Sequence, residues 1–151
     1  MSVKPIPEGY HSVTPYLAVR NASAALDFYQ KAFGATELMR MEDDKGKIGH
    51  AEIKIGDSPI MLADEHPEID FLGPASRGGS TAAILIYTED VDSFFRRALE
   101  AGATEVRPLK DEFYGDRMGT VRDPFGHVWH LATHKEDVPP EEMEARMKAQ
   151  G

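Results

Sequence analysis

The 151-residue sequence contains no cysteine, which excludes disulfides, thiolate metal sites and cysteine nucleophiles. It has no apolar run of membrane-spanning length and no signal-like N-terminal segment, so the expectation is a cytoplasmic protein that does not bind membranes. Positive charge is scarce, because 17 Lys and Arg face 26 Asp and Glu and the net charge is −9. Nucleic acid is therefore not expected as a partner, since binding its backbone requires a basic surface.

Several enzyme motifs are missing as well. There is no Walker loop, no Gly-x-Gly-x-x-Gly between a predicted strand and helix, and no Gly-x-Ser-x-Gly. These absences leave no sequence support for an NTPase, a dinucleotide-binding enzyme or a serine hydrolase of the nucleophile-elbow type. The length fits one domain. The acidic balance is compatible with a cationic small molecule, although it more often serves solubility.

One segment of the first half recurs in the second. Leu17 opens a stretch that reaches Gly34-Ala35-Thr36-Glu37, and Leu85 opens a similar stretch that reaches Gly102-Ala103-Thr104-Glu105. Both pairs of landmarks are 68 positions apart, which predicts a strand, a helix and a strand repeated without insertion. Two copies of one unit are expected, with a site where the copies face each other.

Hydrophobic periodicity predicts a β-α-β-β-β order in each copy, with 9–64 as the first module and 81–134 as the second. In the first, Asn21 caps the helix and Gly34 ends it; the predicted strands are 11–19, 35–41, 49–55 and 59–63. Residues 65–80 are expected to be a linker. In the second, Thr88 or Asp90 caps the helix, and the predicted strands are 81–87, 105–109, 117–122 and 128–133.

Residues 135–151 are predicted to form a C-terminal amphipathic helix outside the repeat. Asp137 is the expected cap, and Met143 and Met147 lie on one side. Such a helix can pack on the sheet, cover a pocket or reach a partner subunit.

The motifs in these positions resemble a known family. Thr14–Val19, Phe28–Ala35, Gly49–Ile53, Asp123–Trp129 and Leu131–Val138 are similar to the vicinal oxygen chelate superfamily, and within it to the PhnB-like branch of glyoxalase/bleomycin resistance proteins. The resemblance covers 9–138 as a single domain. It implies an α+β fold of two tandem βαβββ modules that form a curved-sheet cup. It also implies a homodimer, in which the cup halves come from one chain or are exchanged between chains.

The resemblance further implies where a metal would bind. Metal-dependent members place one ligand on the first strand and one on the last strand of each module. The matching positions here are Thr14, Ala82, Met61 and His130, of which the last two are matched at an offset of 69. Only His130 has a side chain suited to the usual ion, so no metal or other cofactor is predicted.

Seven residues are predicted to line a ligand pocket: Tyr16, His50, Glu52, Met61, Tyr114, Arg117 and His130. His50 and Glu52 are two apart on a predicted strand, so they share a face about 6–7 Å apart. The alternative is that they only hydrogen-bond each other or a neighbouring strand. Arg117 is expected either to clamp an anionic oxygen or to pair with Asp116 or Glu112.

The other polar or aromatic candidates are assigned mostly structural roles. His134 is expected at a rim, His127 in a turn, and His11 and His66 in solvent, while Trp129 is expected in the core. No catalytic residue is assigned.

Three functions follow from these predictions. The first is a metal-independent small-molecule-binding protein of the bleomycin resistance type, linked to antibiotic resistance, with a cationic small molecule as one candidate ligand. The second is a glyoxalase-like lyase, isomerase or dioxygenase-related enzyme that uses His50, Glu52 and His130, with or without a divalent metal. The third is a protein kept for dimeric interaction, with a vestigial pocket.

Overall fold

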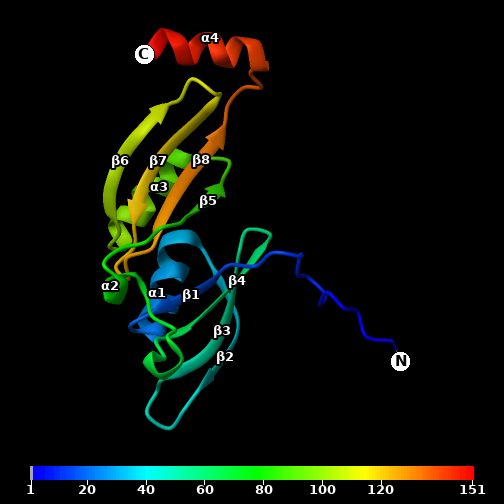
Figure 1. Ribbon diagram of the computed structural model, residues 1–151, viewed down its shortest axis with the longest axis vertical. Helices are drawn as coiled ribbons and strands as arrows, with labels where there is room; N and C mark the ends of the chain where they lie inside the picture. The colour runs from blue at the N-terminus through cyan, green and yellow to red at the C-terminus, as the bar shows by residue number, and fades with distance from the viewer. Residues whose placement is uncertain (1) are drawn as a thin grey trace. The chain divides into compact units, whose positions relative to one another are not determined.

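A computed structural model describes residues 2–151 (Figure 1). The chain divides into two compact units, the first ending at Gly79 and the second running from Ser80 to Gly151. Each unit holds one four-stranded mixed sheet with a helix packed on one of its faces. The predicted α+β class and the βαβββ order of both copies are therefore confirmed.

In the first unit the helix and strands follow one another as predicted. They are β1 (Tyr16–Val19), α1 (Ala22–Phe33), β2 (Thr36–Glu42), β3 (Ile48–Ile55) and β4 (Ser58–Asp64). The sheet order is β1-β4-β3-β2, with β1 parallel to β4 and the other pairs antiparallel. β1 is shorter than the predicted 11–19 and begins directly after Pro15. Proline has no N–H to donate to a sheet, which accounts for the late start.

Helix α1 begins and ends where the sequence predicts. The Asn21 side chain accepts a hydrogen bond from the Ala24 N–H at 3.1 Å, a cap that contributes about 1 kcal/mol. Gly34 ends the helix with a φ of 67°, a left-handed conformation that glycine adopts without strain. The apolar stripe of α1 faces the sheet and is buried: Ala22, Ala25, Leu26, Tyr29 and Phe33.

The last strand of each unit also caps the helix of that unit. The Asp64 carboxylate accepts from the Ala22 N–H at 2.8 Å and from the Ile48 N–H at 2.7 Å. In the second unit the Thr133 hydroxyl accepts from the Val91 N–H at 2.9 Å. The equivalent contact ties the end of the last strand to the start of the helix in both copies.

Strand β3 has one buried face and one open face. Ala51, Ile53 and Ile55 are buried on the side of α1, and His50 and Glu52 are half-buried on the other side. This alternation follows from the period of two along a strand. It places the polar pair on the face that the helix leaves open, as predicted.

Residues 65–80 are more than a linker. They contain a 3₁₀ helix, η1 (Pro67–Ile69), and a short helix, α2 (Pro74–Arg77), and nearly all of them belong to the first unit. A bridge joins His66 to Phe71. Gly73 lies so close to β1 that a Cβ there would be 2.7 Å from the Ala18 carbonyl oxygen. The segment between η1 and α2 is thereby held against β1.

The second unit repeats the architecture. Its elements are β5 (Ala83–Tyr87), α3 (Val91–Ala101), β6 (Thr104–Asp111), β7 (Asp116–Arg122) and β8 (Val128–His134), with the sheet order β5-β8-β7-β6. β5 is parallel to β8. Asp90, of the two predicted caps, accepts from the Ser93 N–H at 3.2 Å. Trp129 is fully buried, as expected, and donates its ring N–H to Asp123 at 2.9 Å.

The two copies are not aligned at a constant offset, which corrects the prediction of 68. The caps Asn21 and Asp90 are 69 positions apart, whereas Gly34 and Gly102 are 68 apart. The cause is that α1 has 12 residues and α3 has 11. The counterpart of Thr14, seven residues before the cap, is therefore Ala83 and not Ala82.

The C-terminal helix, α4 (Pro140–Gln150), differs from its prediction in two ways. Pro139 occupies the cap position, and the expected cap, Asp137, is instead engaged with His134. None of the helix residues is buried, and its apolar residues do not gather on one face, so the amphipathic assignment is wrong. Arg146 attaches the helix to its own unit through the Phe113 carbonyl oxygen at 3.1 Å. No helix within residues 2–151 combines the length and apolar character needed to cross a membrane.

Candidate functional site

The open face of the first sheet gathers four of the seven predicted residues. Tyr16 on β1 is paired with Met61 on β4, which in turn is paired with Glu52 on β3. His50 lies two residues along β3 from Glu52 and therefore on the same face. Three neighbouring strands thus carry the phenol, the thioether, the carboxylate and the imidazole side by side.

Hydrogen bonds join three of these residues to Tyr10. The Tyr16 hydroxyl lies 2.7 Å from Nδ1 of His50, and Nε2 of His50 lies 2.7 Å from Oε2 of Glu52. The other oxygen of Glu52 accepts a hydrogen bond from the Tyr10 hydroxyl. We call this row the Tyr16–Tyr10 relay: Tyr16, His50, Glu52 and Tyr10. Of the two roles weighed for His50 and Glu52, the mutual hydrogen bond is observed. Their role in lining a pocket stays a prediction, because of the seven predicted residues the cavity described below has Tyr16 alone in its lining.

Burial and the contacts of the relay shift the pKa values of Glu52, Tyr10 and Tyr16. Hydrogen bonds from Tyr10 and then from His50 lower the pKa of Glu52, which favours its carboxylate form. Burial, followed by the hydrogen bond and the negative charge of Glu52, raises the pKa of Tyr10 to about 12. Burial and the Glu52 charge also raise the pKa of Tyr16. Both phenols therefore keep their protons at neutral pH.

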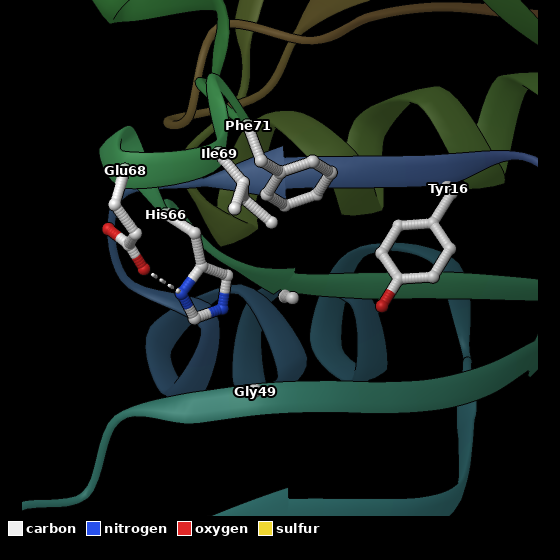
Figure 2. A pocket seen from close by; sticks show the side chains of 7 residues that line it. Tyr16, Gly49, His66, Glu68, Ile69 and Phe71 are labelled. Carbon is white, nitrogen blue, oxygen red and sulfur yellow. Dashed lines mark ion pairs between the residues drawn. The ribbon is translucent and has the colours of Figure 1, made fainter.

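A cavity of about 430 Å³ lies beside the relay (Figure 2). Its lining comes from β1, β3, β4 and the segment after β4: Tyr16, Gly49, Ala63, His66, Glu68, Ile69 and Phe71. The rings of Tyr16 and Phe71 meet edge to face with centroids 5.6 Å apart. Nδ1 of His66 lies 3.4 Å from Oε1 of Glu68. Figure 2 shows the Tyr16 hydroxyl directed toward β3, so one residue is both cavity wall and relay end.

Most of this lining was not anticipated from the sequence. His66 was expected in solvent, but its side chain is only 24% exposed because Phe71 packs near it. Tyr10 lies in a segment without regular structure, so no periodicity marks it. The signal that could have found Phe71 is its own type, since an aromatic residue within a polar Gly- and Pro-rich segment tends to be anchored on the fold.

The other three predicted residues lie in the second unit, and two of them share a face. His130 on β8 is paired with Thr120 on β7, whose hydroxyl lies 2.7 Å from Nδ1 of the histidine. Tyr114 lies just before β7, and its hydroxyl is 3.7 Å from the Met118 sulfur. Met118 is two residues from Thr120, so both contacts are made on the face opposite α3.

Arg117 lies on the other face. Its guanidinium pairs with Asp92 of α3 at 2.9 Å and with Asp111 of β6 at 3.3 Å. Of the two expected roles, the structural one is realised, although with other partners than Asp116 and Glu112. Thr120, the partner of His130 on the neighbouring strand, is three positions from Arg117 on β7, and residues an odd number apart on a strand point to opposite faces. The structure therefore does not bring Arg117 together with His130.

His134, the expected rim residue, has two acidic partners. Its Nδ1 lies 2.7 Å from Asp116, and its Nε2 lies 2.7 Å from Asp137. These hydrogen bonds, Asp116 first, raise the pKa of His134. The other oxygen of Asp116 accepts from the Tyr87 hydroxyl at 2.7 Å. This cluster joins the end of β8 to the segment that leads into α4.

The residues at the expected metal positions do not fit a metal. With the corrected register these are Thr14 and Met61 in the first unit and Ala83 and His130 in the second. A thioether and an alanine methyl cannot replace the imidazole and carboxylate ligands of a hard or borderline divalent ion. Across residues 2–151, no group of three or more His, Asp and Glu is arranged to hold one.

Sequence comparison connects the chain to proteins of several organisms. The protein Mb0911c of Mycobacterium bovis is 43% identical over 143 residues, which cover 93% of this chain and 94% of that protein. The Arabidopsis thaliana protein At5g48480 is 28% identical over 127 residues, covering 80% of this chain and 76% of that one. In each comparison the similarity thus extends over most of this chain and most of the relative.

Solved structures share the fold. TioX from Micromonospora sp. ML1 is 28% identical with a TM-score of 0.64, covering 85% of this chain and all (100%) of TioX. The crystal structure of the Arabidopsis protein gives a TM-score of 0.66 at 27% identity, covering 82% of this chain and 98% of that one. The family model described as Glyoxalase/Bleomycin resistance protein/Dioxygenase superfamily matches residues 9–131. The resemblance predicted from the motifs is confirmed: the chain belongs to the Glyoxalase/Bleomycin resistance protein/Dioxygenase superfamily.

Proposed function

We propose that this chain is a small-molecule-binding protein that works without a metal ion and takes its ligand into the cavity of the first unit. The carrying observation is that Tyr16 serves both the cavity wall and the relay. At about 430 Å³ the cavity has the volume of small-ligand sites. Its combination of apolar walls with a few polar groups is also typical of such sites.

The ligand we propose is flat and cationic. The rings of Tyr16 and Phe71 offer aromatic surface, which attracts cations through the negative face of the ring. The carboxylate of Glu68 lies at the other end of the lining, and none of the seven lining residues is Lys or Arg. The net charge of −9 favours the approach of a cation.

The biological role that fits such a site is sequestration. A protein that binds a toxic compound tightly lowers its free concentration without any reaction, in the manner that the bleomycin resistance part of the family name suggests. Antibiotic resistance, a cytoplasmic location and a homodimer belong to this proposal. Native mass spectrometry of the purified protein tests the dimer directly.

An enzyme is the second candidate, and the contact between His50 and Glu52 favours it. A carboxylate that holds an imidazole, which in turn holds a hydroxyl, can move a proton at that hydroxyl. His130, the third residue of this candidate, is bonded to Thr120 in the second unit. A vestigial pocket is the third candidate, and an open cavity in the first unit counts against it there.

A thermal-shift titration with tryptamine, an aromatic ammonium, tests the proposal. A ligand that binds only the native state raises the melting temperature by mass action. We expect a rise that grows with tryptamine concentration and is unchanged by EDTA, with the tryptamine recovered intact. Conversion of the probe would favour the enzyme instead, and a rise that depends on added zinc would contradict the metal-independent site.

A further inference from the structure

We infer that the relay orients the Tyr16 hydroxyl so that it accepts, and does not donate, a hydrogen bond at the cavity, and that the ligand must therefore present an N–H or O–H group. This inference rests on the proposed binding function and deepens it. It names the chemistry of the ligand at one atom, the phenol oxygen of Tyr16.

Glu52 fixes the position of the first hydrogen in the relay. An ionised carboxylate has only acceptor oxygens. Because Oε2 of Glu52 lies 2.7 Å from Nε2 of His50, the hydrogen in that contact belongs to the imidazole. The Tyr10 hydroxyl donates to the other oxygen, so both oxygens already accept. The lowered pKa of Glu52, caused first by Tyr10, keeps it ionised at neutral pH.

The imidazole of His50 passes this constraint on to Tyr16. A neutral imidazole that carries its hydrogen on Nε2 has an acceptor at Nδ1. Nδ1 of His50 lies 2.7 Å from the Tyr16 hydroxyl, so the phenol donates its single hydrogen there. The raised pKa of Tyr16 agrees with a phenol that keeps this hydrogen. What Tyr16 still offers a ligand is the lone-pair side of its oxygen.

The acidic residue of the lining has the same preference as Tyr16. Glu68 contributes carboxylate oxygens, which only accept. A ligand that donates can therefore bond to both Tyr16 and Glu68, whereas a ligand that only accepts leaves the phenol oxygen of Tyr16 without a donor. Desolvating an acceptor without a partner costs free energy, so the difference translates into selectivity.

Three flat probes of similar size separate the cases at pH 8: indole donates through its N–H, benzofuran lacks that donor, and quinoline only accepts. Binding is followed through the amide ¹⁵N shifts of Gly49 and Ala63, which line the cavity. We expect wild type to bind indole about tenfold more tightly than benzofuran or quinoline, the effect of one hydrogen bond. In His50→Leu the Tyr16 hydrogen is free to turn toward the cavity, so the preference should fall to about one.

Tyr16→Phe provides a second variant that keeps the aromatic wall and should also lose the preference. Thermal unfolding of each variant reports whether it is folded. Equal binding of the three probes by wild type would overturn the acceptor inference while leaving the binding function intact. A preference for indole that persists in His50→Leu would overturn the role of the relay. No shift at either amide with any probe would overturn the proposed function together with the inference.

Discussion

The hydroxyl oxygen of Tyr16 lies 2.7 Å from Nδ1 of His50, although 34 positions separate the two residues. The contact exists because β1 and β3 both flank β4, with Met61 paired to Tyr16 on one side and to Glu52 on the other. The open face of the sheet therefore holds a row of hydrogen-bonding side chains beside an aromatic cavity. The predictions below test this arrangement and the segments that support it.

The pH dependence of stability should report on Glu52. Its folded pKa is lower than the value of about 4.3 in unfolded chains, so it stabilises the native state above that value. This stabilisation is lost as the pH falls through the folded pKa. In Glu52→Gln we expect the free energy of unfolding near neutral pH to fall by about 1 kcal/mol, and the acid loss to be shallower. Urea unfolding at a series of pH values measures both.

Glu141→Gln is the matched control for that series, because Glu141 is exposed on α4. It should leave the pH profile unchanged. If Glu52→Gln and Glu141→Gln give the same profile as wild type, the relay does not contribute to stability.

Phe71→Ala should weaken ligand binding. Removing the ring takes away the edge-to-face partner of Tyr16 and one wall of the cavity. We expect the affinity for tryptamine to fall about tenfold, the size of one aromatic contact. Isothermal titration calorimetry measures it, with Tyr87→Phe in the second unit as a control that should bind as wild type does. If Tyr87→Phe weakened tryptamine binding more than Phe71→Ala, the ligand site would lie in the second unit.

Gly73→Ala tests the packing of the segment after β4. The added Cβ would come within 2.7 Å of the Ala18 carbonyl oxygen, so the segment must move away from β1. We expect a loss of about 1–3 kcal/mol of stability, together with weaker tryptamine binding, since His66 and Phe71 belong to the same segment. Ala75→Ser, at an exposed position of α2, should change neither quantity. Unaltered binding in Gly73→Ala would show that the cavity wall is independent of this contact.

His134 should hold the segment leading to α4 in a pH-dependent way. The hydrogen bonds from His134 to Asp116 and Asp137 raise its pKa, so its contribution is full below the unfolded value of about 6.5 and is lost as the pH rises through the folded pKa. The amides of Lys135 and Glu136, which donate to the Gly115 carbonyl oxygen, report on the segment. Their exchange protection should fall above neutral pH in wild type. In His134→Gln the protection should be lower and should show no such step.

The sequence predicted elements better than it predicted contacts. The bounds of α1 were accurate because Asn21 and Gly34 mark them chemically, and one of the two caps offered for α3, Asp90, is the observed one. The face of His50 followed from the alternation along β3. Helix α3 is one residue shorter than α1, and no residue type in the sequence marks that deletion. Because of it, the counterpart of Thr14 is Ala83 and not Ala82.

The site residues that were missed share a physical reason. His66 and Phe71 lie in a segment without periodic burial, and their positions depend on a bridge and on the close approach of Gly73 to β1. Arg117 was judged from its residue type, but its direction is fixed by strand alternation and by the charge of Asp92 on α3. Such long-range contacts are set by packing and cannot be derived from local sequence.

Metal analysis tests the proposal that the protein works without a metal ion. The residues at the expected ligand positions include a threonine, a methionine and an alanine, so purified protein should hold far less than one equivalent of zinc, nickel, manganese or iron. EDTA should leave the tryptamine affinity unchanged. One equivalent of tightly held metal, removed by EDTA together with ligand binding, would contradict this.

The most direct measurement of the central claim is an amide ¹⁵N shift map of EDTA-treated protein titrated with tryptamine. The account predicts saturable shifts centred on Gly49, Ala63 and Phe71, which line the first-unit cavity. Shifts centred on the second unit, or shifts that require added metal, would contradict it.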